Sequence, residues 1–283
     1  MIPAAFDYVR PSTVAEAVAA LAAGGEEAKV LAGGQSLLPV LRLRLAAPSH
    51  VVDLGGIAAL RSIRVDGDEL VVGAMATHAE VATSSLVRSE SPLLAAVART
   101  VGDRQVRHRG TLGGSLAHAD PAGDLPAAAL ALDATLVIEG PAGRRSVPAA
   151  AFFTDLFTTA LQPDEILVEV RFPHTVGWSA HYEKFHRTAQ AWAVVGVAAT
   201  VQQSGGVITA ARVALTNVGP TPVRASAVEA ALVGANSADA VRSAAAHAVV
   251  GISPPSDAGG SAEYRAHLAT VLTARGVCTA AGF

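Results

Sequence analysis

The sequence predicts an α+β protein of two domains, in which short helices and strands are mixed and the second domain is the smaller. Three observations support this prediction. The chain has 283 residues, which is long for one hydrophobic core and sufficient for two. Segments with helical spacing of apolar residues alternate with short strand-like runs. The composition changes near residues 173–177, so we expect one domain over residues 1–176 and another over 177–283.

Local signals define the elements of the first domain. Thr77 and Glu80 have the spacing of a capping box that opens a helix, and Pro92 stands at the first position of another helix that runs toward Val101. Asp66-Gly67 supplies the turn of a hairpin over residues 63–72. The other elements predicted here are helices at 13–21, behind Ser36 and just after Leu125, strands at 29–32, 51–54, 135–138 and 166–172, and an extended loop over 106–124.

The second domain reads as a hairpin followed by helices. Two apolar runs, 194–202 and 207–216, are joined by Ser204-Gly205-Gly206. Alanine-rich segments with helical spacing then follow. The predicted helices cover residues 226–233, 238–250 and 262–274, with a flexible connector at 254–260.

Two turns with adjacent glycines are the most informative feature of the chain: Ala32-Gly33-Gly34-Gln35-Ser36 and Thr111-Leu112-Gly113-Gly114-Ser115. Glycine permits positive φ and lets another atom approach the backbone closely. Successive exposed N–H groups in such a turn form a concavity suited to an anion, and each serine would add a hydroxyl if it capped the segment that follows. Either turn alone is typical of an ordinary tight turn. Together they indicate a ligand with two neighbouring phosphates, held from both sides.

Other kinds of site find less support. Neither G-x-G-x-x-G nor G-x-x-x-x-G-K-[ST] is present, which removes the main support for Rossmann and P-loop interpretations. Ser36 lacks the closing glycine of a serine-hydrolase elbow. The histidines and aspartates between residues 108 and 124 match no recognised metal-ligand spacing. We therefore expect neither a metal site nor a proton-transfer triad in this chain.

Charge and hydropathy restrict the partners. The formal net charge is −3 and no long basic run occurs, which argues against nucleic acid. The densest basic cluster, Arg104 to Arg109, is either a solvated loop, a positive field beside phosphates, or a docking patch for an acidic partner. No apolar run is long enough to span a bilayer and the N-terminus lacks a signal-peptide pattern, so we expect a cytoplasmic protein that meets a membrane only through its partners. The single cysteine, Cys278, excludes an internal disulfide and a cysteine-held iron–sulfur cluster.

Four segments carry a resemblance to one family. Residues 30–39, with Arg42-Leu43-Arg44 behind them, resemble the first flavin-binding segment of the molybdenum hydroxylase flavoprotein subunits, which include the aerobic carbon monoxide dehydrogenase medium subunit and the FAD domain of xanthine dehydrogenase. Residues 109–115 and 120–126 are similar to the second segment, and 182–185 and 216–224 to two C-terminal stretches. The resemblance covers nearly the whole chain in order. It implies a two-lobed FAD-binding domain of the vanillyl-alcohol-oxidase type, followed by a smaller domain with an antiparallel sheet and helices.

The same resemblance implies a set of FAD contacts. Backbone amides and hydroxyls of both turns would hold the pyrophosphate, and Lys184 would lie beside the flavin ring with Trp192 over its face. Asp124 would lie near the polar edge of the ribityl chain or ring, and Ile166 and Leu167 would pack near the far end of the cofactor. The full implied set is Lys29, Val30, Leu31, Ala32, Gly33, Gly34, Gln35, Ser36, Leu37, Gly110, Thr111, Leu112, Gly113, Gly114, Ser115, His118, Gly123, Asp124, Ile166, Leu167, Lys184 and Trp192.

At some of these positions the chain departs from the family pattern. Gln35 replaces a histidine found in some carbon monoxide dehydrogenase relatives and can still donate a hydrogen bond. Ser115 stands where the second segment usually has asparagine, and Trp192 where these relatives have tyrosine. These substitutions alter individual contacts, and a flat stacking surface is retained at Trp192.

The function implied is that of an electron-transfer flavoprotein, an oxidoreductase subunit. Substrate oxidation would occur at a molybdenum cofactor on a large partner subunit, and electrons would pass through [2Fe–2S] clusters on a small subunit to the FAD of this chain. They would leave to quinone, NAD or oxygen, within a dimer of heterotrimers. Carbon monoxide, N-heterocycles and aldehydes remain open as substrates. Two alternatives also remain: a flavin-free assembly subunit, and a self-sufficient flavin reductase resembling the cell-wall UDP-N-acetylenolpyruvoylglucosamine reductases.

Overall fold

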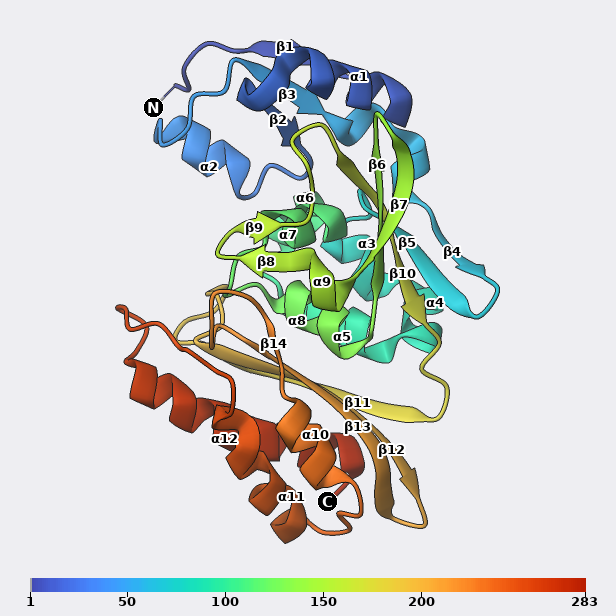
Figure 1. Cartoon of the computed structure of the whole chain (residues 1–283), viewed down its shortest axis with the longest axis vertical. Helices are drawn as coiled ribbons and strands as arrows, with labels where there is room; N and C mark the ends of the chain where they lie inside the picture. The colour runs from blue at the N-terminus through green and yellow to red at the C-terminus, as the bar shows by residue number, and fades with distance from the viewer. Residues whose placement is uncertain (1) are drawn as a thin grey trace.

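The computed structural model describes residues 2–283 and is built from three bodies stacked along its long axis (Figure 1). An N-terminal lobe leads into a middle lobe around a five-stranded sheet, and a C-terminal domain around a four-stranded sheet follows. Each body has its own cluster of buried apolar side chains. No helix among residues 2–283 is long and apolar enough to cross a membrane.

The N-terminal lobe packs two helices with a parallel three-stranded sheet of order β1-β3-β2. Thr13 caps the first helix by accepting from the Glu16 N–H, and that helix buries Ala17, Val18 and Leu21. Val168, from the middle sheet, joins the same apolar cluster and so couples the two lobes. The elements are β1 (Asp7–Val9), α1 (Val14–Gly24), β2 (Ala28–Leu31), α2 (Leu37–Arg42) and β3 (His50–Asp53).

The middle lobe has an antiparallel sheet of order β4-β5-β10-β6-β7 with helices packed beside it. The predicted capping box is present at the start of α3, where Thr77 and Glu80 exchange hydrogen bonds. The strands are β4 (Ile63–Asp66), β5 (Glu69–Gly73), β6 (Thr135–Gly140), β7 (Gly143–Pro148) and β10 (Ile166–Pro173), with a small hairpin of β8 (Phe153–Asp155) and β9 (Thr158–Thr159). The helices are α3 (His78–Thr83), α4 (Ser85–Glu90), α5 (Pro92–Thr100), α6 (Arg104–Arg109), α7 (Leu112–His118), α8 (Asp124–Ala131) and α9 (Ala149–Phe152).

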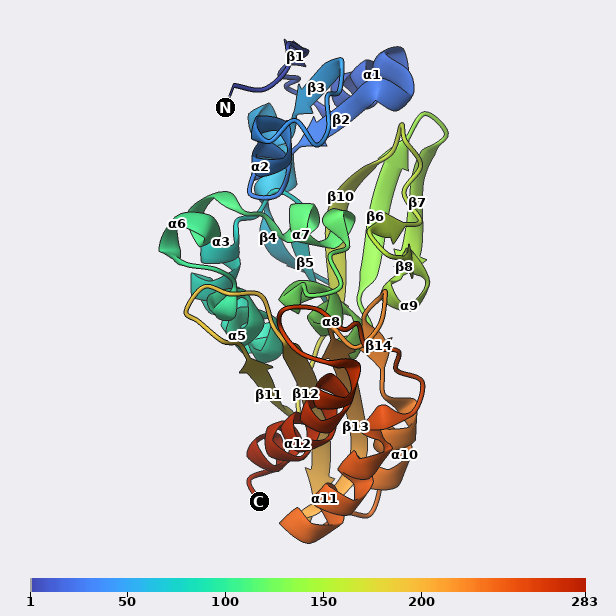
Figure 2. The same cartoon turned by 90° about the vertical axis from the view of Figure 1, so that its left-hand side faces the viewer.

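The C-terminal domain has an antiparallel sheet of order β11-β12-β13-β14. Its helices lie on one face of that sheet, as Figure 2 shows, and the opposite face contributes Ala198 and Ala214 to the core of the middle lobe. The elements are β11 (Trp178–Phe185), β12 (Val195–Ser204), β13 (Val207–Thr216), β14 (Val223–Arg224), α10 (Ser226–Leu232), α11 (Ala238–Ala245) and α12 (Ala262–Ala281).

The predicted α+β class and the two-domain organisation are confirmed, but the extended loop over 106–124 is wrong. That stretch contains the end of α6 and all of α7, which begin at side-chain caps: Asp103 accepts from the Val106 N–H at 2.8 Å, and Thr111 accepts from the Gly114 N–H at 3.1 Å. Ser115 therefore lies inside α7 and does not cap it. Ser36 precedes α2, but its side chain makes no capping hydrogen bond.

Smaller differences concern turns and edges. The first hairpin turns at Gly67-Asp68, because Asp66 already pairs with Glu69 and Gly67 adopts φ +60°. The last helix runs to Ala281 rather than to 274. The sequence prediction missed several short or polar elements, whose apolar pattern is weak: β1, β7, β8, β9, β11, β14 and α4.

Candidate functional site

The two glycine turns lie against each other, although about eighty residues separate them. A Cβ added to Gly33 would stand 2.2 Å from the carbonyl oxygen of Arg109 and 2.7 Å from the Cα of Gly110. A Cβ added to Gly114 would stand 3.4 Å from the Cβ of Ala32. Only glycine at position 33 therefore permits this approach.

The first turn presents unused backbone donors. Within residues 2–283, the N–H groups of Gly33, Gly34, Gln35 and Ser36 donate to no protein atom. Gly34 adopts φ +77°, a conformation that favours glycine. Adjacent free N–H groups of this kind make a concavity for an anion.

Backbone N–H groups of the second turn already donate to protein acceptors. The N–H of Leu112 donates to Ala76 O at 2.9 Å, that of Gly113 to Ala74 O at 2.8 Å, and that of Gly114 to the Thr111 hydroxyl. These bonds tie α7 to the segment that follows β5. The two turns thus converge as the sequence predicts, but the free amides lie on the first.

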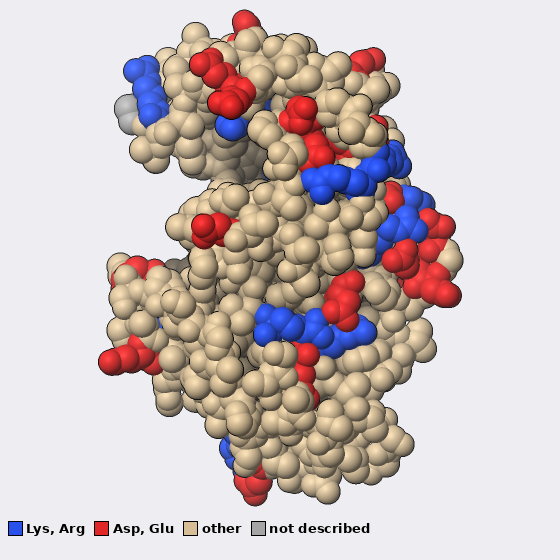
Figure 3. Space-filling view, viewed as in Figure 1, with Lys and Arg blue, Asp and Glu red and all other residues tan. Residues whose placement is uncertain are grey.

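A cavity of about 620 Å³ runs between the turns and into the middle of the molecule. The surface is hollowed between the N-terminal lobe and the body below it (Figure 3). Most of the site residues predicted from the sequence line the cavity: Lys29, Val30, Ala32, Gly33, Gly34, Gln35, Ser36, Leu37, Gly110, Thr111, Gly114, Ser115, His118, Asp124, Lys184 and Trp192.

The remaining predicted residues do not line the cavity. Leu112 and Leu167 are buried in the core of the middle lobe, and Ile166 is buried in the core of the N-terminal lobe. Gly113 abuts Ala74, with 2.5 Å between an added Cβ and the Ala74 Cβ. The other two are Leu31, paired in β2, and Gly123, which precedes α8.

A buried ion pair stands at the inner end of the cavity. The Lys184 ammonium lies 2.7 Å from one oxygen of Asp124 and donates to Thr100 O at 3.2 Å. The Tyr182 hydroxyl donates to the other oxygen of Asp124 at 2.5 Å. Burial raises the pKa of Asp124, and the Lys184 ammonium opposes part of that rise. Burial and the neighbouring carboxylate raise the pKa of Tyr182, so this phenol stays a donor.

His78 is a further buried group on the cavity wall. Its side chain makes no hydrogen bond among residues 2–283, and its Nδ1 is closed off from solvent. Burial, with Arg107 nearby, lowers the pKa of His78 to about 4, so the imidazole is neutral at pH 7.

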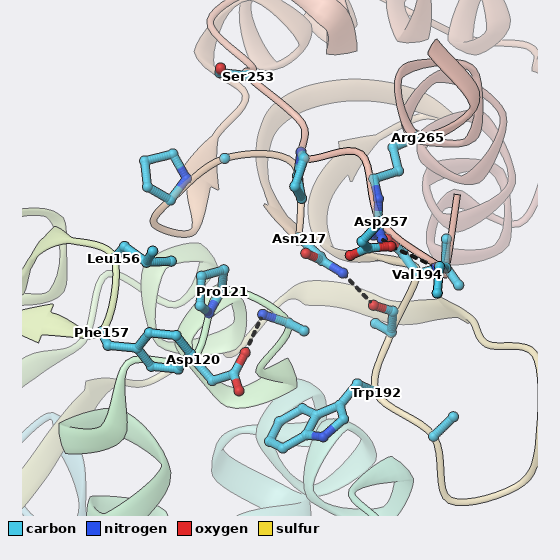
Figure 4. Close-up of a pocket in the computed structure, with 18 of the residues that line it drawn as sticks. Asp120, Pro121, Leu156, Phe157, Trp192, Val194, Asn217, Ser253, Asp257 and Arg265 are labelled. Atoms are coloured by element: carbon cyan, nitrogen blue, oxygen red, sulfur yellow. Dashed lines mark hydrogen bonds and ion pairs between the residues drawn. The ribbon is translucent and has the colours of Figure 1, made fainter. Parts of the chain in front are cut away.

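A second cavity, of about 780 Å³, lies beyond Trp192 (Figure 4). Trp192 is 55% exposed and lines both cavities from the segment between β11 and β12. In this second cavity Asn217 donates to Ala193 O at 2.7 Å, and the buried Arg265 pairs with Asp257. Trp192 thus forms a partition between two hollows.

Comparison with known proteins identifies the family. The model for the FAD-binding domain in molybdopterin dehydrogenase matches residues 4–175, and that for the carbon monoxide dehydrogenase flavoprotein C-terminal domain matches 180–280. The carbon monoxide dehydrogenase medium chain of Hydrogenophaga pseudoflava is 42% identical over 97% of this chain and 96% of its own length. The chain belongs to the FAD-binding medium subunits of the molybdenum hydroxylases.

Further similarities extend across the medium-subunit family. A solved structure of carbon monoxide dehydrogenase from Hydrogenophaga pseudoflava superimposes with a TM-score of 0.96 and 44% identity, over 99% of this chain and 98% of that one. The 6-hydroxypseudooxynicotine dehydrogenase complex subunit alpha of Paenarthrobacter nicotinovorans is 36% identical over 97% of this chain and 94% of its own. These relatives are dehydrogenase subunits, and this medium subunit is likewise part of an oxidoreductase.

The cavity of this medium subunit fits FAD chemically. Free N–H groups of the first turn suit a diphosphate, and Val101 and Val106 offer apolar contact on the cavity wall. Lys184 supplies a fixed positive charge at the inner end, because Asp124 and Thr100 O hold its ammonium.

Sequence reasoning missed several lining residues of the medium subunit. Tyr182 does not line the cavity but donates to Asp124, which does, and it could have been found because it shares one face of β11 with Lys184 at a spacing of two. No sequence pattern indicated a role for His78 beyond its place in the capping box of Thr77 and Glu80. Part of the basic cluster Arg104 to Arg109 has a structural role, because Arg107 in α6 donates to Val101 O and Gly102 O, which precede that helix. The other missed lining residues are Val40, Val101, Gly102, Val106, Ala117, Asp120, Gln190 and Ala191.

Proposed function

We propose that this chain is the FAD-carrying electron-transfer subunit of a heteromeric molybdenum hydroxylase. It would receive electrons from partner [2Fe–2S] clusters and release them to an external acceptor. When bound, FAD supplies both one-electron and two-electron chemistry, which suits a link between a cluster and a two-electron acceptor. The observation that carries the proposal is the row of free N–H groups at residues 33–36, packed against Gly110 in the cavity that ends at Lys184.

We assign the diphosphate to the first turn. The N–H groups of residues 33–36 have no other partner among the described residues, so an anion there would satisfy donors that are otherwise unpaired. The second turn would contribute the Ser115 hydroxyl and a rigid backing, because its amides at 112–114 already have acceptors.

We assign the flavin ring to the inner part of the cavity. Lys184 would stabilise negative charge on the ring, and Asp124 would keep the ammonium oriented. Trp192 would cover the ring face, because its side chain lines the cavity. It belongs to the segment between β11 and β12. Because Lys184 and Asp124 are buried and paired, the charges beside the ring would be held in fixed positions.

We propose a large subunit with the molybdenum cofactor and a small subunit with the [2Fe–2S] clusters, in a dimer of heterotrimers. Carbon monoxide is the first substrate to test, because the relatives at 42% identity and in the solved structure are carbon monoxide dehydrogenases. An N-heterocycle or an aldehyde is the next class, and quinone, NAD and oxygen are the acceptors to compare.

We also propose the domain boundary at residues 176 and 177, which lies between the matched ranges 4–175 and 180–280.

The test uses the complex with and without this chain. The assembled complex is reduced anaerobically with carbon monoxide, or with an aldehyde or N-heterocycle, and then mixed with quinone, NAD or oxygen while the flavin and iron–sulfur bands are followed. We expect substrate to reduce the clusters in both preparations, and the acceptor to reoxidise them rapidly only when this chain and its FAD are present. Equal reoxidation without this chain would contradict the proposal.

A further inference from the structure

His78 is placed between the two ends of the cavity. It begins α3, and its backbone N–H donates to Gly110 O at 2.9 Å. Gly110 is also one of the two residues that a Cβ on Gly33 would meet. On the inner side, the cavity wall continues through Val101 and Gly102, which follow the carbonyl that accepts from Lys184. The imidazole therefore lies between the free N–H groups and the buried cation.

The imidazole has an unmet need for a hydrogen-bond partner. His78 is 4% exposed, and neither ring nitrogen is paired within residues 2–283. Buried polar groups almost always have a partner, so each exception calls for a reason. Nδ1 is sealed from the cavity, whereas Nε2 lies beside the lining residue Gly110, 2.8 Å from where a Cβ on that glycine would stand.

The tautomer follows from this placement. A neutral imidazole carries one N–H and one bare nitrogen. Nδ1 is unpaired in either tautomer: a proton there would bury a donor with no acceptor, whereas a proton on Nε2 leaves Nδ1 a bare nitrogen and presents a donor at the cavity wall. The donor is fixed in direction, because α3 is anchored by its capping box and by the bond to Gly110.

We propose that the Nε2–H of His78 donates a hydrogen bond to an oxygen of bound FAD, on the part of the cofactor between its diphosphate and its flavin ring. This inference rests on the proposed function, since it takes FAD as the occupant of the cavity. His78 is thus a binding residue whose Nε2–H has no protein partner until the cofactor arrives, while the sealed Nδ1 stays unpaired.

The experiment compares His78→Phe, His78→Gln and a control. Phenylalanine keeps a flat ring without nitrogen, and glutamine keeps an N–H donor on a side chain of similar reach. Thr200→Val is the matched control, because the Thr200 hydroxyl is also buried and unpartnered but lies outside the cavity. FAD affinity is measured by flavin fluorescence, and melting temperature with and without FAD, on the full chain alone and in its complex.

We expect His78→Phe to weaken FAD binding about tenfold, the loss of one hydrogen bond in a closed site. The melting temperature without FAD should not fall, because an unpaired polar group has been removed, but the increment that FAD adds should shrink. His78→Gln should bind within about threefold of the unsubstituted chain, and Thr200→Val should bind equally well.

Other outcomes overturn the inference. Unchanged FAD affinity in His78→Phe, with a lower melting temperature before FAD is added, would show that the imidazole is structural. If the unsubstituted chain binds FAD neither alone nor in its complex, the proposed function fails first and this inference with it. If His78→Phe does not fold, the Nε2–H of the unsubstituted protein is followed by NMR. Protection from exchange should rise when FAD is added, and equal exchange with and without FAD would contradict the proposal.

Discussion

Lys184 and Asp124 form an ion pair whose side chains are 6% and 3% exposed. Such a pair gains little over an apolar replacement, because both charges lose their hydration. Breaking it is costly, because one charge then stays buried alone. Its presence beside a cavity is better explained by the charge that it offers to a ligand than by its contribution to stability.

Replacing Lys184 with Met should lower the free energy of unfolding at pH 7 by about 3 kcal/mol. The loss should shrink as pH falls, because Asp124 then takes up a proton and the unpaired charge disappears. The sign follows from burial, which raises the pKa of Asp124 in the folded state above its unfolded value, so that acid favours the folded form of this variant. Urea unfolding at pH 5 and pH 7 measures both effects.

The double variant Asp124→Asn with Lys184→Met is the matched control. It removes both charges and keeps an acceptor for the Tyr182 hydroxyl, so it should recover most of the lost stability. If the single and double variants are equally unstable, the ion pair does not account for the loss.

At the scale of single residues, the sequence singles out Gly33 and Gly34 by their turn motif and Lys184 by the family resemblance. All three line the cavity, and their contacts with FAD stay a prediction. Leu112 and Gly113 belong to the same motif but face inward, because the carbonyls of Ala76 and Ala74 take their N–H groups. His78 could not be found, since a histidine on a helix has no pattern that reveals an unpaired ring nitrogen.

At the scale of elements, the site depends on how closely two segments approach. The segment from β2 to α2 supplies free donors, and the segment from α6 to α7 supports it from behind. The caps at Asp103 and Thr111 start α6 and α7 and so set the position of that support. The prediction of a loop there failed because glycines at 113 and 114 suggest a turn, whereas Gly113 lets α7 pack against the backbone of Ala74 and a Cβ at Gly114 would meet the Thr111 hydroxyl.

Gly33→Ala should separate the two segments, because its Cβ would stand 2.2 Å from Arg109 O. We expect FAD affinity to fall at least about a hundredfold, as several charge-assisted hydrogen bonds lose their geometry together. Calorimetric titration with FAD measures this change. Gly276→Ala, within α12, is the control: the nearest atom to its Cβ would be 3.5 Å away, so binding should be unaffected and stability the same or slightly higher. Full FAD affinity in Gly33→Ala would show that the approach of the segments is not required.

At the scale of the whole molecule, the cavity walls come from all three bodies. The N-terminal lobe gives the free donors, the middle lobe gives α6, α7 and Asp124, and the C-terminal domain gives Lys184 and Trp192. The C-terminal sheet also packs against the middle lobe through Ala198 and Ala214. A ligand that bridges these walls would stabilise their arrangement by mass action.

The architecture was predicted from the order of elements along the chain and from the resemblance to a family, and not from hydrophobic periodicity alone. The main strands and the capped helices were visible as local patterns. The edge strands β1, β7 and β14 were not, because short or polar strands depend on pairing partners far along the chain. The second cavity beyond Trp192 was equally hidden, since its walls come from loops that only the tertiary fold brings together.

The central claim is that the free N–H groups of residues 33–36 hold the diphosphate of FAD. The most direct measurement is a parallel titration of the full chain, in its complex, with FAD and with riboflavin, which has the same ring but lacks the diphosphate and the adenosine. We predict one FAD bound per chain, and riboflavin binding weaker by at least about a thousandfold, since several charge-assisted hydrogen bonds are lost. Equal affinity for the two ligands, or no uptake of FAD at all, would contradict the account.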